Sequence, residues 1–306
     1  MIIVRLKGGL GNQMFQYAAG LALAERHLTT LKLDVSWFRR RPDHAAHNRY
    51  ALSCLNITEQ FATAAEIAPY EPLTLTRTER WSVGLARALR LHQYARRHTR
   101  TAAWHVPPHV NYYADFEALP DGIALDGYFQ SEKFFASCRE QLRLHFSFRY
   151  PPTPEVADVA RRIQSGPSVA LHFRRGDYAR NPEFARQFGV LDVDYYHRAL
   201  ALLRERSPGA RAYIFSDDIE AVAAEFKPDG PHEFVRCIQP HHAHDKIRLM
   251  SLCEHIAIAN STFSWWAAWL NPSPHKLVIV PDPWFTGSPD EPRDIVPETW
   301  TSLPRR

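Results

Sequence analysis

The feature that most constrains the fold is an apolar run, Val169 to Phe173, that leads directly into Arg174-Arg175-Gly176-Asp177. An apolar run of this length favours a buried β-strand, and the Gly-Asp pair favours a tight turn. The chain therefore places two adjacent guanidiniums at the carboxyl end of a strand, which is where open α/β sheets bind ligands.

The paired arginines favour a phosphate ligand. A planar guanidinium presents a rigid fork of N–H donors that matches phosphate oxygens, and each such bond contributes roughly 1.5–3 kcal/mol. Two adjacent forks fit a diphosphate. The alternative is that Arg174 or Arg175 pairs with Asp177 and stabilises the turn, and we expect this of one of the two.

Length and composition indicate two packed domains. The 306 residues suffice for two domains of ordinary size, and 45% hydrophobic residues indicate packed cores. The proline group at residues 151–154 is typical of a linker, so we predict domains at residues 1–150 and 151–306. The four cysteines lack C-x-x-C spacing, which indicates neither zinc nor a disulfide framework and fits a reducing cytosol.

The first segment predicts a strand, a glycine loop and a helix. Ile2 to Leu6 are mainly apolar, Gly8-Gly9-Leu10-Gly11-Asn12-Gln13 follow, and apolar residues then recur at helical spacing. Glycines let the backbone approach a ligand, and helix N–H groups face the same point. Met14 stands where a dinucleotide motif needs its third glycine, which disfavours that site. The alternative is a tight turn without a ligand. A strand at the start, in place of a charged leader, predicts no signal peptide.

One segment is both basic and amphipathic. Residues 77–100 carry seven arginines around Trp81, Leu85 and Leu89. This pattern fits a helix resting on an anionic membrane surface, and the alternative is the solvated face of an ordinary helix. The net charge of +4 does not by itself indicate a nucleic-acid partner.

Polar side chains end three further predicted strands. The strand at residues 125–132 carries Asp126, Tyr128 and Gln130, and an aromatic ring with an amide suits a sugar; a helix follows from about residue 132 to 144. The strand at residues 211–215 precedes Asp217 and Asp218. We expect one of these aspartates to accept hydrogen bonds from a guanine edge and the other to cap a helix.

The third of these strands, at residues 255–259, precedes Asn260-Ser261-Thr262-Phe263-Ser264 at the start of a helix. The hydroxyls and backbone amides of this turn predict a phosphate cradle that faces the Arg174 turn. The tryptophans that follow, Trp265, Trp266 and Trp269, are predicted to pack in the core. A last strand is expected at residues 277–280.

Two patterns look like metal sites, and neither predicts one. Asp192-Val193-Asp194 matches a D-x-D clamp, but Asp194 is well placed to be a helix N-cap. The histidines in His241-His242-Ala243-His244-Asp245 lie in a loop that leads into a helix from Asp245 to Cys253. We therefore expect no metal.

Five motifs in the same order along the chain resemble those of the α-1,2-fucosyltransferases of glycosyltransferase family 11. They are Gly8-Gly9-Leu10-Gly11-Asn12-Gln13-Met14-Phe15-Gln16-Tyr17, Gly127-Tyr128-Phe129-Gln130, His172-Phe173-Arg174-Arg175-Gly176-Asp177-Tyr178, Ser216-Asp217-Asp218 and Asn260-Ser261-Thr262-Phe263-Ser264-Trp265-Trp266.

The resemblance implies an α/β protein of GT-B type, with two Rossmann-like domains facing a central cleft. The first would lie on the acceptor side, and the second would hold the donor, GDP-β-L-fucose. Family members invert the anomeric centre and need no metal or other cofactor. Animal members have a membrane anchor and stem, and this chain shows neither pattern. The resemblance thus implies a bacterial cytoplasmic enzyme of surface-glycan (O-antigen or capsule) synthesis, working at the inner face of the plasma membrane.

The resemblance also implies roles for single residues. Arg174 would contact the β-phosphate and stabilise the leaving group, while His172 and one aspartate of the Asp217-Asp218 pair would contact the guanosine side. Asn12 would reach the phosphates or fucose. The implied donor-binding residues are Gly11, Asn12, His172, Arg174, Asp217, Asp218, Asn260, Ser261, Thr262 and Ser264. The acceptor-binding residues would be Tyr128 and Gln130, and Asp126 is the candidate proton acceptor, although a dissociative path needs none.

The implied reaction is transfer of L-fucose to the 2-hydroxyl of a terminal galactose. The partners are then GDP-fucose and a galactose-terminated oligosaccharide, with a lipid-linked one included, and no nucleic acid. Three alternatives stay open: a GDP-sugar-binding protein without transferase activity, a basic nucleic-acid or membrane-surface module built on residues 77–100, and a fucosyltransferase of another linkage such as α-1,6.

Overall fold

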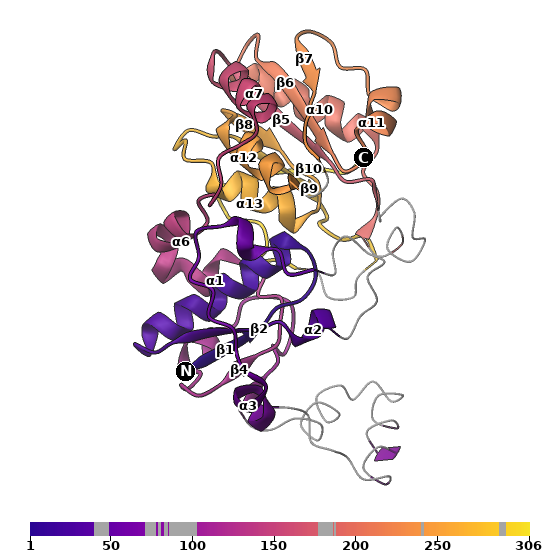
Figure 1. The fold of residues 1–306 in the computed structure, drawn as a ribbon. Helices are drawn as coiled ribbons and strands as arrows, with labels where there is room; N and C mark the ends of the chain where they lie inside the picture. The colour runs from indigo at the N-terminus through magenta and orange to yellow at the C-terminus, as the bar shows by residue number, and fades with distance from the viewer. Residues whose placement is uncertain are drawn as a thin grey trace. The chain divides into compact units, whose positions relative to one another are not determined.

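The computed structural model describes residues 1–39, 49–70, 103–176, 188–239, 242–287 and 292–306, with a few isolated positions between them. The chain divides into two compact units (Figure 1). Unit 1 comprises Met1–Ser53 and Ile57–His145, and unit 2 comprises Cys54–Asn56 and Phe146–Arg306. Each unit contains a parallel sheet, which confirms the predicted α/β class.

The sheet of unit 1 has, among the described residues, four parallel strands in the order β2-β1-β4-β3. The strands are β1 Ile2–Arg5, β2 Leu31–Asp34, β3 Trp104–His105 and β4 Ala124–Leu125. Helix α1, Leu10–Arg26, follows β1 and is almost entirely buried. The strand, loop and helix predicted for the first segment are therefore confirmed. The shorter helical elements are α2 Ser36–Arg39, η1 Leu52–Cys54, α3 Ala64–Ile67, η2 Ala68–Tyr70 and η3 Ala114–Ala118.

The strand predicted at residues 125–132 is wrong in extent, because β4 ends at Leu125. Phe129 has a φ of 49°, in the left-handed region, which an extended strand cannot contain. The helix predicted at about 132–144 is instead two elements, η4 Glu132–Cys138 and α6 Arg139–His145, with non-helical backbone at Phe135. The segment that carries Tyr128 and Gln130 is thus a loop.

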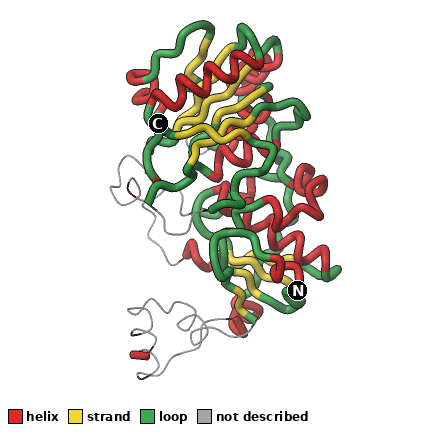
Figure 2. The backbone as a smooth tube through the Cα atoms, turned by 180° about the vertical axis from the view of Figure 1, so that it is seen from behind, coloured by secondary structure: helices red, strands yellow, loops and turns green. Residues whose placement is uncertain are grey.

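The sheet of unit 2 is larger, with six parallel strands among the described residues in the order β10-β9-β8-β5-β6-β7 (Figure 2). The strands are β5 Ser168–Phe173, β6 Arg211–Ser216, β7 His232–Phe234, β8 His255–Ala257, β9 Val278–Asp282 and β10 Thr301–Pro304. The four strands predicted for this half of the chain are present. The edge strands β7 and β10 were not predicted, because they lack a run of apolar residues.

Strand β5 is buried on both faces, as its largely apolar sequence favours in a parallel sheet. Val169, Leu171 and Phe173 pack in one core cluster with helix α10, Val193–Arg206. Alternation along the strand places His172 on the opposite face, where its ring lies 5.8 Å from that of Phe263. Phe263 belongs to helix α13, Thr262–Leu270, which packs against α12, His244–Leu252.

The proline group at residues 151–154 is not only a linker. Pro154 begins helix α7, Pro154–Gln164, and the Thr153 hydroxyl accepts a hydrogen bond from the N–H of Val156. Proline is favourable in the first turn because no intrahelical partner awaits its missing N–H. The change of unit falls before the prolines, between His145 and Phe146.

The tryptophans of α13 lie in the core, as predicted. Trp265 and Trp266 are fully buried and Trp269 nearly so. The indole N–H of Trp265 donates to the carbonyl of Ile295 at 2.6 Å, which satisfies its polar atom inside the unit. Within the described residues no helix is both long and apolar enough to cross a membrane.

Candidate active site

The predicted donor residues of unit 2 meet because β5 and β6 are parallel neighbours that end together. Phe173 pairs with Ser216 in the last register position, so Arg174 and Asp217 leave the sheet side by side. An Arg174 guanidinium nitrogen lies 2.9 Å from the Asp217 Oδ2 atom. The N–H of Arg175 donates to Asp217 Oδ1 at 2.8 Å. The sheet thus holds one arginine and one aspartate at its carboxyl edge.

Asp217 is held as a carboxylate. Burial alone would raise its pKa, but the Arg174 guanidinium and the N–H groups of Arg175 and Gly176 outweigh burial and lower the pKa. The neighbouring Asp218 has a different task, since its side chain accepts from the N–H of Ala221 and caps helix α11, Ile219–Glu225. One aspartate of the pair caps a helix, as the sequence predicted.

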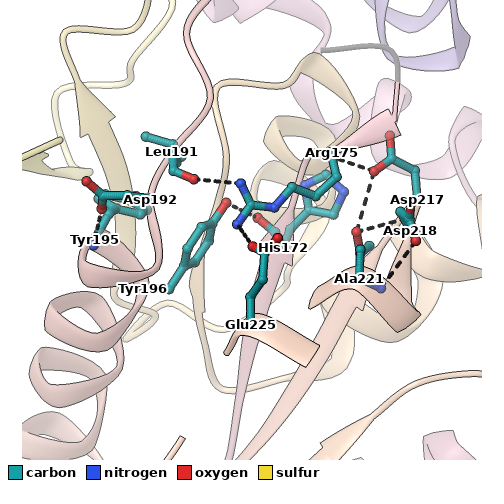
Figure 3. A network of polar contacts seen from close by, with 11 residues as sticks. His172, Arg175, Leu191, Asp192, Tyr195, Tyr196, Asp217, Asp218, Ala221 and Glu225 are labelled. Carbon is teal, nitrogen blue, oxygen red and sulfur yellow. Dashed lines mark hydrogen bonds and ion pairs between the residues drawn. The ribbon is translucent and has the colours of Figure 1, made fainter. Parts of the chain in front are cut away.

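The second arginine is a structural residue (Figure 3). One Arg175 nitrogen donates to the carbonyl of Leu191 at 3.0 Å and another to Glu225 at 2.7 Å, so the guanidinium ties the end of β5 to α11. Asp177, the partner expected from sequence, lies outside the described residues. Of the two arginines, Arg174 therefore remains our candidate for the predicted phosphate-binding role.

His172 is a buried neutral imidazole. Burial lowers its pKa to about 3, although Asp217 opposes the shift. Its Nδ1 atom has no hydrogen-bond partner among the described residues, and its backbone carbonyl accepts from the Tyr196 hydroxyl at 3.0 Å. A buried ring nitrogen without a partner is unfavourable, so this position suits a ligand donor or a water molecule.

The turn after β8 only partly matches the predicted cradle. Ser261 is the N-cap residue of α13, but its side chain makes no capping hydrogen bond. The Ser264 hydroxyl is fully buried and bonds to the carbonyls of Ala259 and Ser261, so it is engaged inside its own turn. Asn260 donates to the carbonyl of Phe188 at 2.7 Å.

The predicted residues of unit 1 form a second group. Asn12, in the first turn of α1 next to the buried Gly11, accepts a hydrogen bond from Gln130 at 2.9 Å. Asp126 is buried and forms an ion pair with Lys7 at 2.7 Å. The same ammonium lies 4.8 Å from the centre of the Tyr128 ring, which is 45% exposed. The structure thus links the glycine loop to the loop after β4.

Two glutamines hold the glycine loop in place. The Gln13 side chain donates to the carbonyls of Gly8 and Arg49 and accepts from the N–H of Ala51. The Gln16 side chain accepts from the N–H of Lys7 at 2.9 Å. Both glutamines are fully buried, and their roles explain why amides follow the glycines at this spacing.

Sequence reasoning missed Lys7 and Lys246. Lys246 lies in the first turn of α12, and its ammonium donates to the carbonyl of Ser216 at the end of β6. Burial lowers the Lys246 pKa, Asp217 opposes this and Arg174 reinforces it. A lone lysine after a histidine run gives no sequence signal, because only the packing of α12 brings it to this sheet edge.

The two metal-like patterns have structural roles. The N-cap of α10 is Asp192, which accepts from the N–H of Tyr195 at 2.9 Å, so the predicted cap at Asp194 is off by two residues. Asp245 pairs with Arg248 at 2.8 Å in α12, and His241 lies outside the described residues. Among described side chains no group of three or more His, Cys, Asp or Glu could hold a metal ion.

Most of the basic amphipathic segment at residues 77–100 also lies outside the described ranges.

Gly176 provides a direct test of the Asp217 arrangement. A Cβ atom at this position would lie 2.4 Å from Asp217 Oδ2, so Gly176→Ala must displace the carboxylate from Arg174. We expect the affinity for GDP to fall about tenfold or more. Calorimetry measures it, with Gly166→Ala as the matched control because an added Cβ there meets nothing within 4 Å. Equal affinities in the two variants would refute the importance of this contact.

Comparison with known proteins decides the family. A sequence profile of glycosyl transferase family 11 matches residues 104–300, more than half of the chain. The chain belongs to glycosyl transferase family 11. This is the family indicated by the five motifs, and the protein is a glycosyltransferase.

Family 11 relatives match over most of the chain. An α-1,2-colitosyltransferase from Escherichia coli is 29% identical and covers 99% of both chains. The O-antigen biosynthesis glycosyltransferase WbnK, also from Escherichia coli, is 28% identical over 97% of this chain and 99% of its own. The galactoside 2-α-L-fucosyltransferase Sec1 of Mus musculus is 26% identical over 88% of this chain and 64% of its own.

Proposed function

We propose that the protein transfers L-fucose from GDP-β-L-fucose to the 2-hydroxyl of a terminal galactose, with inversion and without a metal. The observation that carries the proposal is the Arg174–Asp217 pair at the joined ends of β5 and β6, beside the buried His172. This family 11 chain thereby presents a fixed guanidinium where a parallel sheet binds a nucleotide diphosphate. The mouse relative, by its name, is a galactoside fucosyltransferase.

The proposed reaction breaks the bond between fucose C1 and the diphosphate oxygen while the acceptor oxygen bonds to C1. Positive charge develops on the sugar ring and negative charge on the leaving diphosphate. Arg174, oriented by Asp217, stabilises the negative charge, and a well-placed donor of this kind contributes about 2.7–4 kcal/mol. Asp217 thus positions Arg174, while the neutral His172 supplies a nitrogen to the nucleotide.

Unit 1 offers the groups for the acceptor. An exposed aromatic ring at Tyr128 suits the apolar face of a sugar, and the amide of Gln130 can bond its hydroxyls. Asp126 is our candidate for the group that takes the proton of the attacking hydroxyl. Lys7 fixes its carboxylate at 2.7 Å.

The role of Asp126 is tested by Asp126→Asn, which keeps the shape and removes the proton acceptor. We expect turnover to fall about 10²-fold or more while GDP affinity stays within a factor of about two. Asp115→Asn, at an exposed position of the same unit, is the control. An Asp126→Asn protein that retains its turnover removes Asp126 from the mechanism and favours a dissociative path without a dedicated base.

A second donor, GDP-colitose, is favoured by one observation. The α-1,2-colitosyltransferase from Escherichia coli matches this chain from end to end. Colitose is L-fucose without the 3-hydroxyl, so the diphosphate and guanosine contacts proposed above serve either donor. The distinction lies in the sugar pocket alone.

The proposal is tested by GDP release in the presence of EDTA, with lactose as acceptor and either GDP-fucose or GDP-colitose as donor. We expect faster release with GDP-fucose and an α-1,2-linked product by linkage analysis. Faster release with GDP-colitose would replace the donor, and an α-1,6 product would replace the linkage. Binding of GDP-fucose without any release would support the non-catalytic alternative. Loss of activity in EDTA would overturn metal independence.

The biological setting is part of the same proposal. We place the reaction in surface-glycan synthesis in the cytoplasm, with a lipid-linked oligosaccharide at the inner face of the plasma membrane among its acceptors. The name of the O-antigen relative WbnK supports this setting. Arginines of the segment 77–100 would make the membrane contact.

A further inference from the structure

A lysine outside the family motifs lies at the edge of the proposed diphosphate site. Lys246 occupies the first turn of α12, and its ammonium donates to the carbonyl of Ser216, the last residue of β6. The next residue, Asp217, holds Arg174 at 2.9 Å. Lys246 therefore reaches the end of β6, next to the end of β5 that Arg174 follows, from a helix later in the sequence than Asp217.

The Lys246 ammonium interacts electrostatically with both members of this ion pair. Besides burial, which lowers the Lys246 pKa most, the two groups that act on it are Asp217, which raises the pKa, and Arg174, which lowers it. Arg174 and Lys246 carry like charges, which repel each other. An arriving phosphate, with up to two negative charges, relieves that repulsion.

An independent observation at the same strand ends points to a ligand. The buried Nδ1 atom of His172 lacks a hydrogen-bond partner among the described residues. The charges that influence the His172 pKa are those of Asp217, Arg174 and Lys246. An unpartnered polar atom, two cations and one carboxylate thus lie at the adjoining ends of β5 and β6.

We propose that Lys246 is a second cation of the diphosphate site, binding the phosphate oxygens alongside Arg174. The inference rests on the proposed function. An ammonium has three N–H donors, and among the described residues its hydrogen-bond partner is the Ser216 carbonyl. Arg174 is fixed by Asp217, whereas an ammonium on a four-carbon stem can follow the leaving diphosphate as its charge grows.

The alternative role for Lys246 is purely structural, as a clamp that ties α12 to the end of β6. The two roles predict different losses. A clamp would hold the whole end of β6 in place, so its removal would weaken the binding of both the nucleoside and the diphosphate. A phosphate ligand affects only molecules that carry phosphate.

The test is calorimetric binding of GDP and of guanosine to the full chain with Lys246→Met and Lys246→Arg. We expect Lys246→Met to weaken GDP about tenfold or more and to leave guanosine unchanged, with Lys246→Arg in between. The matched control is Lys276→Met, because that ammonium also donates to a backbone carbonyl of unit 2, that of Asn271. Should Lys246→Met unfold, Lys246→Gln, which still donates to Ser216, makes the same comparison.

Each other outcome overturns a stated part of the inference. Unchanged GDP affinity in Lys246→Met removes Lys246 from the site. Equal weakening of GDP and guanosine assigns it the clamp role. Wild-type protein that does not bind GDP contradicts the proposed function itself, and the role of Lys246 falls with it.

Discussion

Arg174→Ala is expected to lower turnover at least about 100-fold while leaving a folded protein. The side chain is only 15% exposed and its guanidinium lies 2.9 Å from Asp217, so the charge is held in a largely water-excluded position. Preorganised charge of this kind stabilises the leaving diphosphate without reorganisation during the reaction. Steady-state GDP release measures the loss, and circular dichroism verifies the fold.

Two further variants test whether the expected loss of turnover is specific to the Arg174 guanidinium. Arg174→Lys keeps the charge but loses the planar fork, so we expect intermediate turnover. Arg162→Ala removes a guanidinium that pairs with Glu233 on the surface of the same unit, and turnover should stay within about twofold of wild type. Near-normal turnover in Arg174→Ala would show that the strand-end arginine is structural.

Trp265→Ala is expected to destabilise unit 2 by about 3–5 kcal/mol. Trp265 is fully buried, its ring packs against Trp266 and Trp300, and its indole N–H donates to Ile295. Truncation leaves both a cavity and an unpaired carbonyl. Urea unfolding followed by circular dichroism measures the change in the free energy of unfolding.

Matched variants distinguish a packing role of Trp265 from a role in ligand binding. Trp265→Phe keeps most of the apolar volume and loses the hydrogen bond, so a loss of about 1–3 kcal/mol is expected. Trp81, 74% exposed, serves as the control, and Trp81→Ala should change stability by about 0.5 kcal/mol or less. A stable Trp265→Ala protein with impaired sugar binding would instead assign the indole to a stacking platform.

The ends of the strands could be predicted from sequence because, at each of them, a largely apolar run is followed at once by polar residues. Val169–Phe173 is the plainest case, since a parallel strand buried on both faces needs continuous apolar residues. Parallel pairing then dictates that Arg174 and Asp217 meet. That one aspartate of the Asp217-Asp218 pair caps a helix followed from the preference of aspartate for helix N-caps.

The contacts that could not be predicted from sequence depend on packing between segments that lie far apart in the chain. Lys246 lies 29 residues beyond Asp217, and only the docking of α12 brings its ammonium to Ser216. The Lys7–Asp126 pair joins residues from the ends of two neighbouring strands of a different sheet. The proline group favours a linker over a helix, whereas Pro154 begins helix α7, because proline is favourable in a first turn.

A crystal structure of the protein with GDP bound would show directly where the diphosphate lies. We predict that the diphosphate lies within hydrogen-bond distance of the Arg174 guanidinium, at the carboxyl ends of β5 and β6. A nucleotide bound elsewhere, or an Arg174 side chain that points away from the phosphates, would contradict it.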